Sequence, residues 1–234
     1  MSGKWICIIF ALAVPVLVGA AENERGRVIR PFNGKDLTGW KTRAQGENTN
    51  CWVVGKAKVA ADPKALEVEA GGRELINHPE WGKSLDLYTE QKFGDCRVEV
   101  EVMVPQGSNS GIYLMGEYEV QVCDSFGREE IGQGDMGSIY SAATAAKNVS
   151  RKPGEWQRFV IDFRAPRFDA QGNKIANAMF VKVTLNGVVI RENVEVKGST
   201  GGGLTGEEHP TGPLMLQGNH GAVAYRNLRI IPAR

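Results

Sequence analysis

The segment CRVEVEVMVP, from Cys96 to Pro105, alternates apolar and polar side chains almost without a break. Successive side chains of a strand point to opposite faces, so this alternation predicts a β-strand with one buried face. The valines Val98, Val100, Val102 and Val104 share the predicted buried face, with Cys96 in the same register. The charged residues between the valines are expected on the other face.

The same pattern recurs along the chain, in EWQRFVIDFRA from Glu155, AMFVKVTLNGVVIREN from Ala178 and AVAYRNLRIIP from Ala222. Asn186 and Gly187 separate two β-rich runs, which is a strong signal for a hairpin. After the N-terminal residues, no segment carries a long apolar stripe with the period of a helix. The sequence therefore predicts an all-β fold, an antiparallel β-sandwich.

The predicted strands form one domain, over residues 22–234, because neither a repeat of fixed period nor a linker divides the chain. The connections are rich in Gly, Asn, Ser and Pro. The longest, KGSTGGGLTGEEHPTG, covers residues 197–212. Long loops in compact domains often carry function, so this loop is expected to do so.

The first 21 residues read as a signal peptide. Lys4 precedes an apolar run from Trp5 to Val18, and the small residues Gly19, Ala20 and Ala21 follow it. The run is short for a bilayer span, which needs about 20 residues, so cleavage is favoured over a retained anchor. We expect export to the periplasm or the outside of the cell, without membrane insertion after cleavage.

Composition and cysteine usage exclude several classes. The formal net charge is +1, which gives no reason to expect a nucleic acid partner. Cys7 leaves with the signal peptide, and Cys51, Cys96 and Cys123 remain. Because Cys96 and Cys123 are expected on opposed strand faces, a disulfide framework is not predicted. No CxxC or His/Cys cluster suggests structural zinc, and the oligomeric state is left open.

The segment YEVQVCD, from Tyr118 to Asp124, places an acid and an amide on one face of a predicted strand. Glu119 and Gln121 alternate with apolar residues, so they point away from the core. If the outer face of this sheet forms a groove, these groups suit hydroxyl groups of a sugar. The nearby aromatic residues Tyr113, Tyr140 and Trp156 suit its C–H faces. Trp156, like Trp40, is also interpreted as a core anchor.

Four segments resemble the 3-keto-disaccharide hydrolase domain: PFNGKDLTGWK, NSGIYLMGEYEVQVCDS, KPGEWQRFVI and GPLMLQGNHGAVAYRNLRI. They occur in the family's order, and the resemblance covers about residues 32–232. It implies a concanavalin A-like jelly roll, as in laminarinases. It also implies activity on glycosides whose 3-hydroxyl is oxidised to a ketone, by lyase and hydratase steps that amount to hydrolysis.

The resemblance assigns site residues by matching motifs. Glu119 and Gln121 match a YEVQxxD strand, Asn109 matches an NSG turn, and Gln217 and His220 match a QxxHG segment. Two positions depart from the pattern. Met115 stands where many members have Arg, and Asn219 stands where an Asp is common.

The chemistry of a 3-keto-glycoside needs a base near C2, a donor near the ketone oxygen and an acid for the leaving oxygen. Glu119 and His220 are the candidate catalytic residues, with their roles as base and acid not distinguished. The candidate substrate-binding residues are Asn109, Tyr113, Gln121, Tyr140, Gln217 and Asn219.

No cofactor is implied, although Glu119 and His220 could converge on a divalent metal ion, for which the sequence shows no diagnostic spacing. The alternative function is a non-catalytic, lectin-like carbohydrate-binding module, since the same sandwich serves lectins. A cell-surface interaction domain is a third class.

Overall fold

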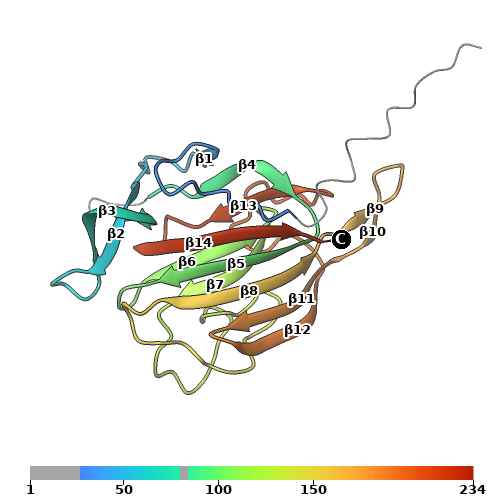
Figure 1. Ribbon diagram of the computed structural model, residues 1–234. Coiled ribbons are helices and arrows are strands. Elements are labelled where there is room, and N and C mark those ends of the chain that lie inside the picture. The colour runs from blue at the N-terminus through green and yellow to red at the C-terminus, as the bar shows by residue number, and fades with distance from the viewer. Residues whose placement is uncertain (1–26, 80–83, 234) are drawn as a thin grey trace, which may run out of the picture.

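The computed structural model describes residues 27–79 and 84–233. These residues form fourteen strands and no helix (Figure 1). The strands are β1 (Trp40–Thr42), β2 (Trp52–Val59), β3 (Leu66–Asn77), β4 (Leu87–Phe93), β5 (Cys96–Met103), β6 (Asn109–Leu114), β7 (Tyr118–Cys123), β8 (Gln157–Arg164), β9 (Arg167–Phe168), β10 (Lys174–Ala176), β11 (Ala178–Leu185), β12 (Val188–Val196), β13 (Gly212–Leu216) and β14 (Val223–Pro232). The predicted all-β class is confirmed.

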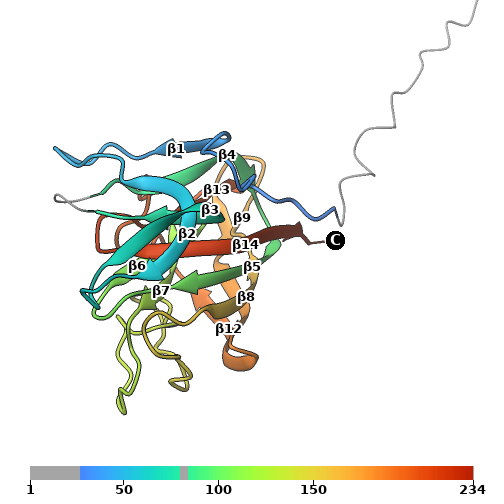
Figure 2. The ribbon, with the colours of Figure 1, turned by 60° about the vertical axis from the view of Figure 1, so that its left-hand side comes forward.

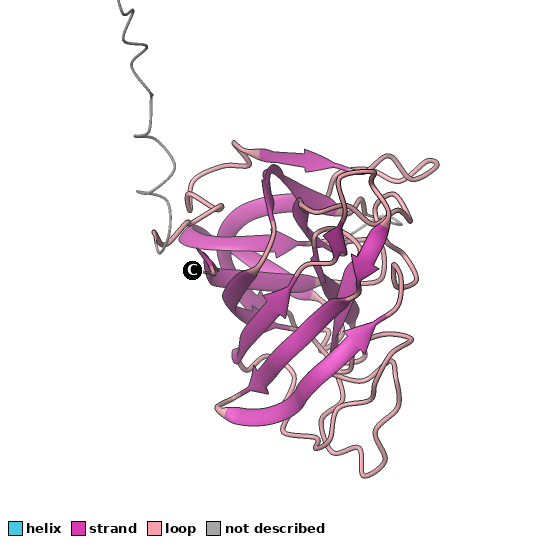
Figure 3. Cartoon of the chain, turned by 90° about the vertical axis from the view of Figure 1, so that its right-hand side faces the viewer, coloured by secondary structure: helices cyan, strands magenta, loops and turns pink. Residues whose placement is uncertain are grey.

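Two sheets face each other as the layers of a sandwich (Figure 2). One has five strands in the order β1-β4-β13-β6-β7, and the other has seven in the order β12-β11-β8-β5-β14-β3-β2. A small ribbon pairs β10 with β9. All pairings between these strands are antiparallel, as in a jelly roll. Loops fill the remainder of the described chain (Figure 3).

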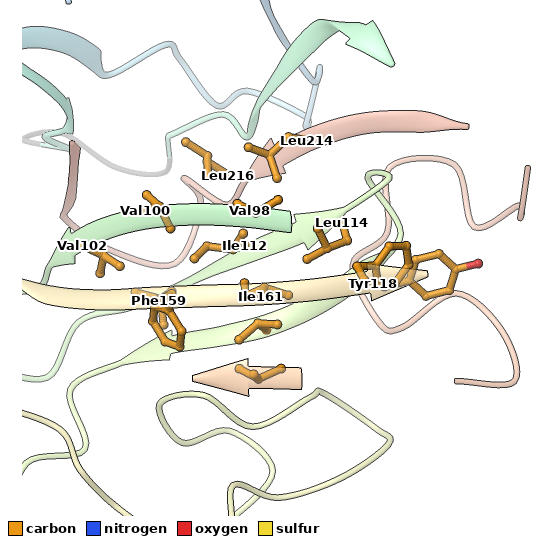
Figure 4. Packing of buried hydrophobic residues seen from close by; sticks show 14 of the residues in the cluster. Val98, Val100, Val102, Ile112, Leu114, Tyr118, Phe159, Ile161, Leu214 and Leu216 are labelled. Carbon is orange, nitrogen blue, oxygen red and sulfur yellow. The ribbon is translucent and has the colours of Figure 1, made fainter. Parts of the chain in front are cut away.

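The main core lies between the two sheets (Figure 4). Val98, Val100 and Val102 on β5 are at most 1% exposed, and Val104 follows them at 2%. The predicted register of this strand is therefore confirmed. Ile112 on β6 belongs to the same cluster from the opposite layer. Burying one such side chain contributes about 1.5–3 kcal/mol, so this cluster fixes which face of each strand points outward.

A second, smaller core lies on the outer side of the seven-stranded sheet. The register between β2 and β3 shifts after Gly55, and a Cβ on Gly72 would lie 2.1 Å from the Gly55 backbone. Only a residue without a side chain permits this approach. The far half of the hairpin brings Leu66 and Ala57 into a cluster with Met103 and Ala224.

Local turn chemistry also agrees with the sequence. Asn186 and Gly187 both have positive φ, 51° and 83°, and join Leu185 of β11 to Val188 of β12. These values match a type I′ hairpin turn, whose twist suits paired strands. The predicted hairpin is confirmed.

Cys51, Cys96 and Cys123 carry free thiols. In residues 27–79 and 84–233 no helix of a length and apolarity suited to crossing a membrane is found. The predicted signal peptide, residues 1–21, lies outside the described residues.

Candidate active site

The outer face of the five-stranded sheet carries the predicted site. On β7, Tyr118, Val120 and Val122 enter the core, so Glu119 and Gln121 point the other way. The neighbouring strands follow the same alternation. Tyr113 of β6 stands opposite Glu119, and Gly111 stands opposite Gln121.

Loops shield this face from solvent, whereas an acid on the outer face of a sheet is usually exposed. Glu119 is 2% exposed and Gln121 is 4% exposed. The amide of Glu119 donates to Thr200 Oγ1 at 3.0 Å, and its carbonyl oxygen accepts from the Tyr140 amide at 3.2 Å. The free edge of β7 is therefore closed by two loops, and Glu119 is enclosed between them.

The carboxylate of Glu119 lies over Gly111. A Cβ at Gly111 would be 2.1 Å from Glu119 Oε1 and 2.9 Å from Tyr113 Cε2. Any side chain at this position would therefore displace the carboxylate. Gly111 is the glycine of the NSG motif. This motif was expected to form a turn, but its three residues open strand β6 and pair with β7, so Gly111 leaves space for the acid on the neighbouring strand.

Burial raises the pKa of Glu119 from 4.5 to about 8. The main cause is the loss of water around the charged form. The hydroxyl of Tyr113 offsets part of this rise, and the negative charge of Asp86 adds to it. A carboxyl group with a pKa near 8 can exchange a proton at neutral pH, as an acid–base catalyst must.

Tyr113 and Gln217 form a connected pair beside Glu119. The Tyr113 hydroxyl donates to the Gly201 carbonyl at 3.1 Å and accepts from Gln217 Nε2 at 3.2 Å. The backbone N–H of Gln217 donates to the Gly111 carbonyl at 3.0 Å. Gln217 is therefore held next to the Glu119 carboxylate. The structure thus brings together three of the predicted site residues.

Four buried oxygen atoms of this region have no hydrogen-bond partner in the described chain. They are Glu119 Oε1, Gln121 Oε1, Gln217 Oε1 and Asn109 Oδ1. An unsatisfied buried acceptor costs about 1–3 kcal/mol, so several on one sheet face call for a functional explanation. All four are acceptors, which is the complement of hydroxyl groups on a sugar.

His220 and Asn219 lie at one end of this face. Their loop is held by Asn77 Nδ2, which donates to the carbonyls of Gly218 and Gly221 at 2.7 Å each. His220 is exposed, and its Nδ1 contacts Asn219 Oδ1. A Cβ on Gly221 would lie 3.1 Å from the backbone nitrogen of Asn109, so this loop neighbours Asn109. Within the described chain, no hydrogen bond joins the His220 imidazole to Glu119.

Two of the aromatic residues expected near the groove, Tyr140 and Trp156, lie on different sides of the molecule. Tyr140 is 37% exposed and lies beside the covering loop, since a Cβ on Gly201 would be 2.8 Å from its ring. Trp156 lies on the other side of the molecule, where it packs against the second core and the Arg226 guanidinium stacks 4.0 Å from its ring centre. Trp156 therefore does not line the groove, and its packing agrees with the alternative interpretation of this residue as a core anchor. It precedes β8, which belongs to the seven-stranded sheet.

The long connection from β12 to β13, residues 197–211, covers the site through contacts of Thr200 and Gly201. This is the loop that was expected from the sequence to carry function. Its anchor is Glu117, a buried acid that the sequence did not single out. Glu117 accepts from Ser199 Oγ, from the Thr205 amide and hydroxyl, and from the Gly206 amide, at 2.7–3.0 Å. These bonds hold the loop against the β6–β7 turn.

Two further residues of the face were missed by sequence reasoning. Asp86, directly before β4, is 2% exposed, and Arg43, directly after β1, is half-buried. Leu87 points into the core, so its neighbours Asp86 and Tyr88 both point to the outer face. This alternation was the sequence signal that could have identified Asp86. Among the described residues no group of three or more His, Cys, Asp and Glu side chains is arranged to hold a metal ion.

The fold and this site define a carbohydrate-active protein built on a jelly-roll sandwich, and comparisons with known proteins specify the family. A sequence profile of the 3-keto-alpha-glucoside-1,2-lyase-like domain matches residues 28–231. The chain belongs to this family. A search of curated proteins found no match.

Solved structures agree with this assignment. A candidate glycosyl hydrolase from Parabacteroides distasonis is 30% identical, with a TM-score of 0.67 over 88% of this chain and 83% of that one. A second candidate glycosyl hydrolase from the same organism is 18% identical, with a TM-score of 0.58 over 89% and 94% of the two chains. The second likeness shows the fold alone.

Proposed function

We propose that this protein cleaves 3-keto-glycosides by removing the C2 proton, eliminating the group on C1 and adding water to the resulting enone. The observation that carries the proposal is Glu119, a buried acid with a raised pKa and a carboxylate oxygen free of partners. The family match supports the substrate class.

The reaction has a defined balance of bonds. A ketone at C3 acidifies the hydrogen on C2, and a base takes that proton while the electron pair moves toward the ketone oxygen. The pair then returns, the bond from C1 to the leaving oxygen breaks, and that oxygen receives a proton. Water adds across the new double bond, so the sum is hydrolysis. This route needs no oxocarbenium-like centre flanked by two carboxylates, which ordinary glycosidases use.

Glu119 is assigned the C2 proton. Its pKa near 8 makes the ionised form a stronger base than an ordinary carboxylate, while a fraction of the protein carries that form at neutral pH. Gly111 keeps the space under the carboxylate open. His220, at the exposed end of the same face, is assigned the proton for the leaving oxygen, with Asn219 orienting its ring.

The unpartnered amide oxygens are assigned to the sugar. Gln121, Gln217 and Asn109 each present an acceptor to hydroxyl groups, and Tyr140, which is 37% exposed, supplies ring surface. Tyr113 is fully buried and accepts a hydrogen bond from the side chain of Gln217, which it holds in place. Such groups fix the orientation of the ring, so that the C2 hydrogen faces Glu119.

Export is part of the proposal. It rests on Lys4, the apolar run that follows and the small residues at 19–21. Mass spectrometry of the protein from its native host tests it, because an intact Met1 in mature material would disprove cleavage.

The test of function is incubation of the purified protein with a 3-keto-glucoside and, separately, with the unoxidised glucoside. We expect turnover of the oxidised sugar alone, and a loss of about 10²-fold or more in Glu119→Gln. Glu90→Gln, an exposed acid on β4, is the matched control. Binding of sugars without turnover would instead identify a carbohydrate-binding module.

A further inference from the structure

A partly buried ion pair lies on the same sheet face as Glu119, on the strands farthest from β7. Arg43 Nη1 is 3.7 Å from Asp86 Oδ2. Asp86 also accepts from Gln45 Nε2 at 2.7 Å and from the Gly218 amide at 2.9 Å. Asp86 is thus fixed by the segment that follows β1 and by the segment that leads to His220.

Arg43 is held by a second contact as well. Its Nη1 donates to the Gly202 carbonyl at 2.9 Å, and the adjacent Gly201 carbonyl accepts from the Tyr113 hydroxyl. A Cβ on Gly202 would lie 2.7 Å from that hydroxyl oxygen. The guanidinium is therefore fixed beside Tyr113, at the covering loop. A guanidinium has five N–H donors, and only Nη1 has hydrogen-bonding contacts in the described chain, so others can serve a ligand.

The sheet order sets the span between the cation and the acid. Arg43 continues β1, and Gly111, under the Glu119 carboxylate, lies on β6, three strands away. Neighbouring strands are about 4.8 Å apart, so the two backbones are separated by roughly 14 Å. Tyr113 lies within this span: a Cβ on Gly202, whose carbonyl holds Arg43, would be 2.7 Å from the Tyr113 hydroxyl oxygen, and a Cβ on Gly111 would be 2.9 Å from its ring. The guanidinium and the Glu119 carboxylate therefore both lie beside Tyr113.

The chemistry requires a donor at the ketone oxygen, and position 115 does not supply it. Met115, which replaces the Arg common in the family, belongs to the core cluster and is 6% exposed. Among the residues placed on this face, Arg43 is the half-buried cation beside Tyr113.

We propose that Arg43 binds the ketone oxygen on C3 and stabilises the enolate formed there, with Asp86 and Gly202 holding the guanidinium in place. This inference rests on the proposed function. When the base takes the C2 proton, the electron pair of the C2–H bond forms a C2–C3 double bond, and the C3 oxygen becomes negative. An N–H of Arg43 donates to that oxygen. The negative charge leaves again as the C1–O bond breaks.

The test compares Arg43→Ala and Arg43→Lys with the wild-type protein on a 3-keto-glucoside. Loss of one preorganised oxyanion donor typically lowers turnover by about 10²–10³-fold, so we expect this loss in kcat for Arg43→Ala, and partial activity for Arg43→Lys. Guanidinium ion added in solution should restore part of the activity of Arg43→Ala. Lys41→Ala, an exposed neighbour on β1, should retain wild-type turnover.

A purely structural role for Arg43 predicts a different result. Glu117→Gln loosens the covering loop without touching the cation, so added guanidinium should not rescue it. If Arg43→Ala keeps its kcat, or loses activity without rescue as Glu117→Gln does, the role of Arg43 is disproved while the proposed function stands. If the wild-type protein turns over no 3-keto-glucoside, the proposed function fails and this inference fails with it.

Discussion

Replacing Glu119 with Gln should stabilise the protein at alkaline pH while removing its activity. Glutamine has the shape of the protonated acid and cannot ionise. In the folded wild-type protein the pKa of Glu119 is about 8, compared with 4.5 for an unperturbed glutamate. The folded state therefore favours the protonated form, and the stability that this preference provides is complete below pH 4.5. It is lost progressively as the pH rises from 4.5 through 8.

The magnitude follows from the shift. Each pKa unit corresponds to about 1.4 kcal/mol. Because Glu119 ionises readily in the unfolded state and resists ionisation in the folded state, the wild-type protein loses about 3 kcal/mol of stability by pH 7 and about 5 kcal/mol by pH 9. Glu119→Gln escapes this cost. We expect similar unfolding free energies for the two proteins at pH 4, and a variant more stable by several kcal/mol at pH 9.

The assay is chemical denaturation of both proteins at pH 4, 7 and 9, where other titrating groups cancel in the difference. Glu90→Gln is the control, because Glu90 is exposed and pairs with Lys41, so its replacement should give no gain at alkaline pH. A difference between Glu119→Gln and wild type that does not grow with pH would refute the assignment of a buried, protonated Glu119.

Three further outcomes follow from the same contacts. If Glu119 is the base, kcat/KM should rise with pH and level off above about pH 8, after subtraction of the uncatalysed rate; a profile that falls instead would make Glu119 the acid. Gly111→Ala should push the carboxylate aside, lowering turnover at a stability cost of about 1–3 kcal/mol, and full activity would contradict the placement of Glu119 over Gly111. Val100→Asp buries an unpaired charge in the core and should prevent folding or cost several kcal/mol, whereas an unchanged melting temperature would show that the strand register is wrong.

The fold could be read from the sequence because strand alternation is a local signal. The valines of β5 and the Asn186–Gly187 turn predict their own geometry from nearest neighbours alone, and both are confirmed. The alternation also placed Glu119 on the outward face. It could not show that this face is covered, because the covering loop meets β7 through Thr200, which is 81 residues from Glu119 in sequence.

The missed residues share this cause. Arg43 follows a strand of three residues, too short for a visible period, and Asp86 precedes its strand. The sheet order brings both residues to the face that carries Glu119, because β1 and β4 lie beside β13 and β6, which are far from them in sequence. The same cause left two interpretations of Trp156 open, groove or core, because the sequence does not show that its segment belongs to the opposite sheet.

The most direct test of the central claim is deuterium incorporation at C2. A 3-keto-glucoside is incubated with the protein in deuterated water, and the recovered sugar is analysed by NMR beside an enzyme-free sample. Cleavage by elimination and water addition predicts deuterium at C2 of the product, formed faster than uncatalysed exchange and dependent on Glu119. Cleavage that leaves the C2 hydrogen in place, or cleavage of the unoxidised glucoside at a comparable rate, would contradict the account.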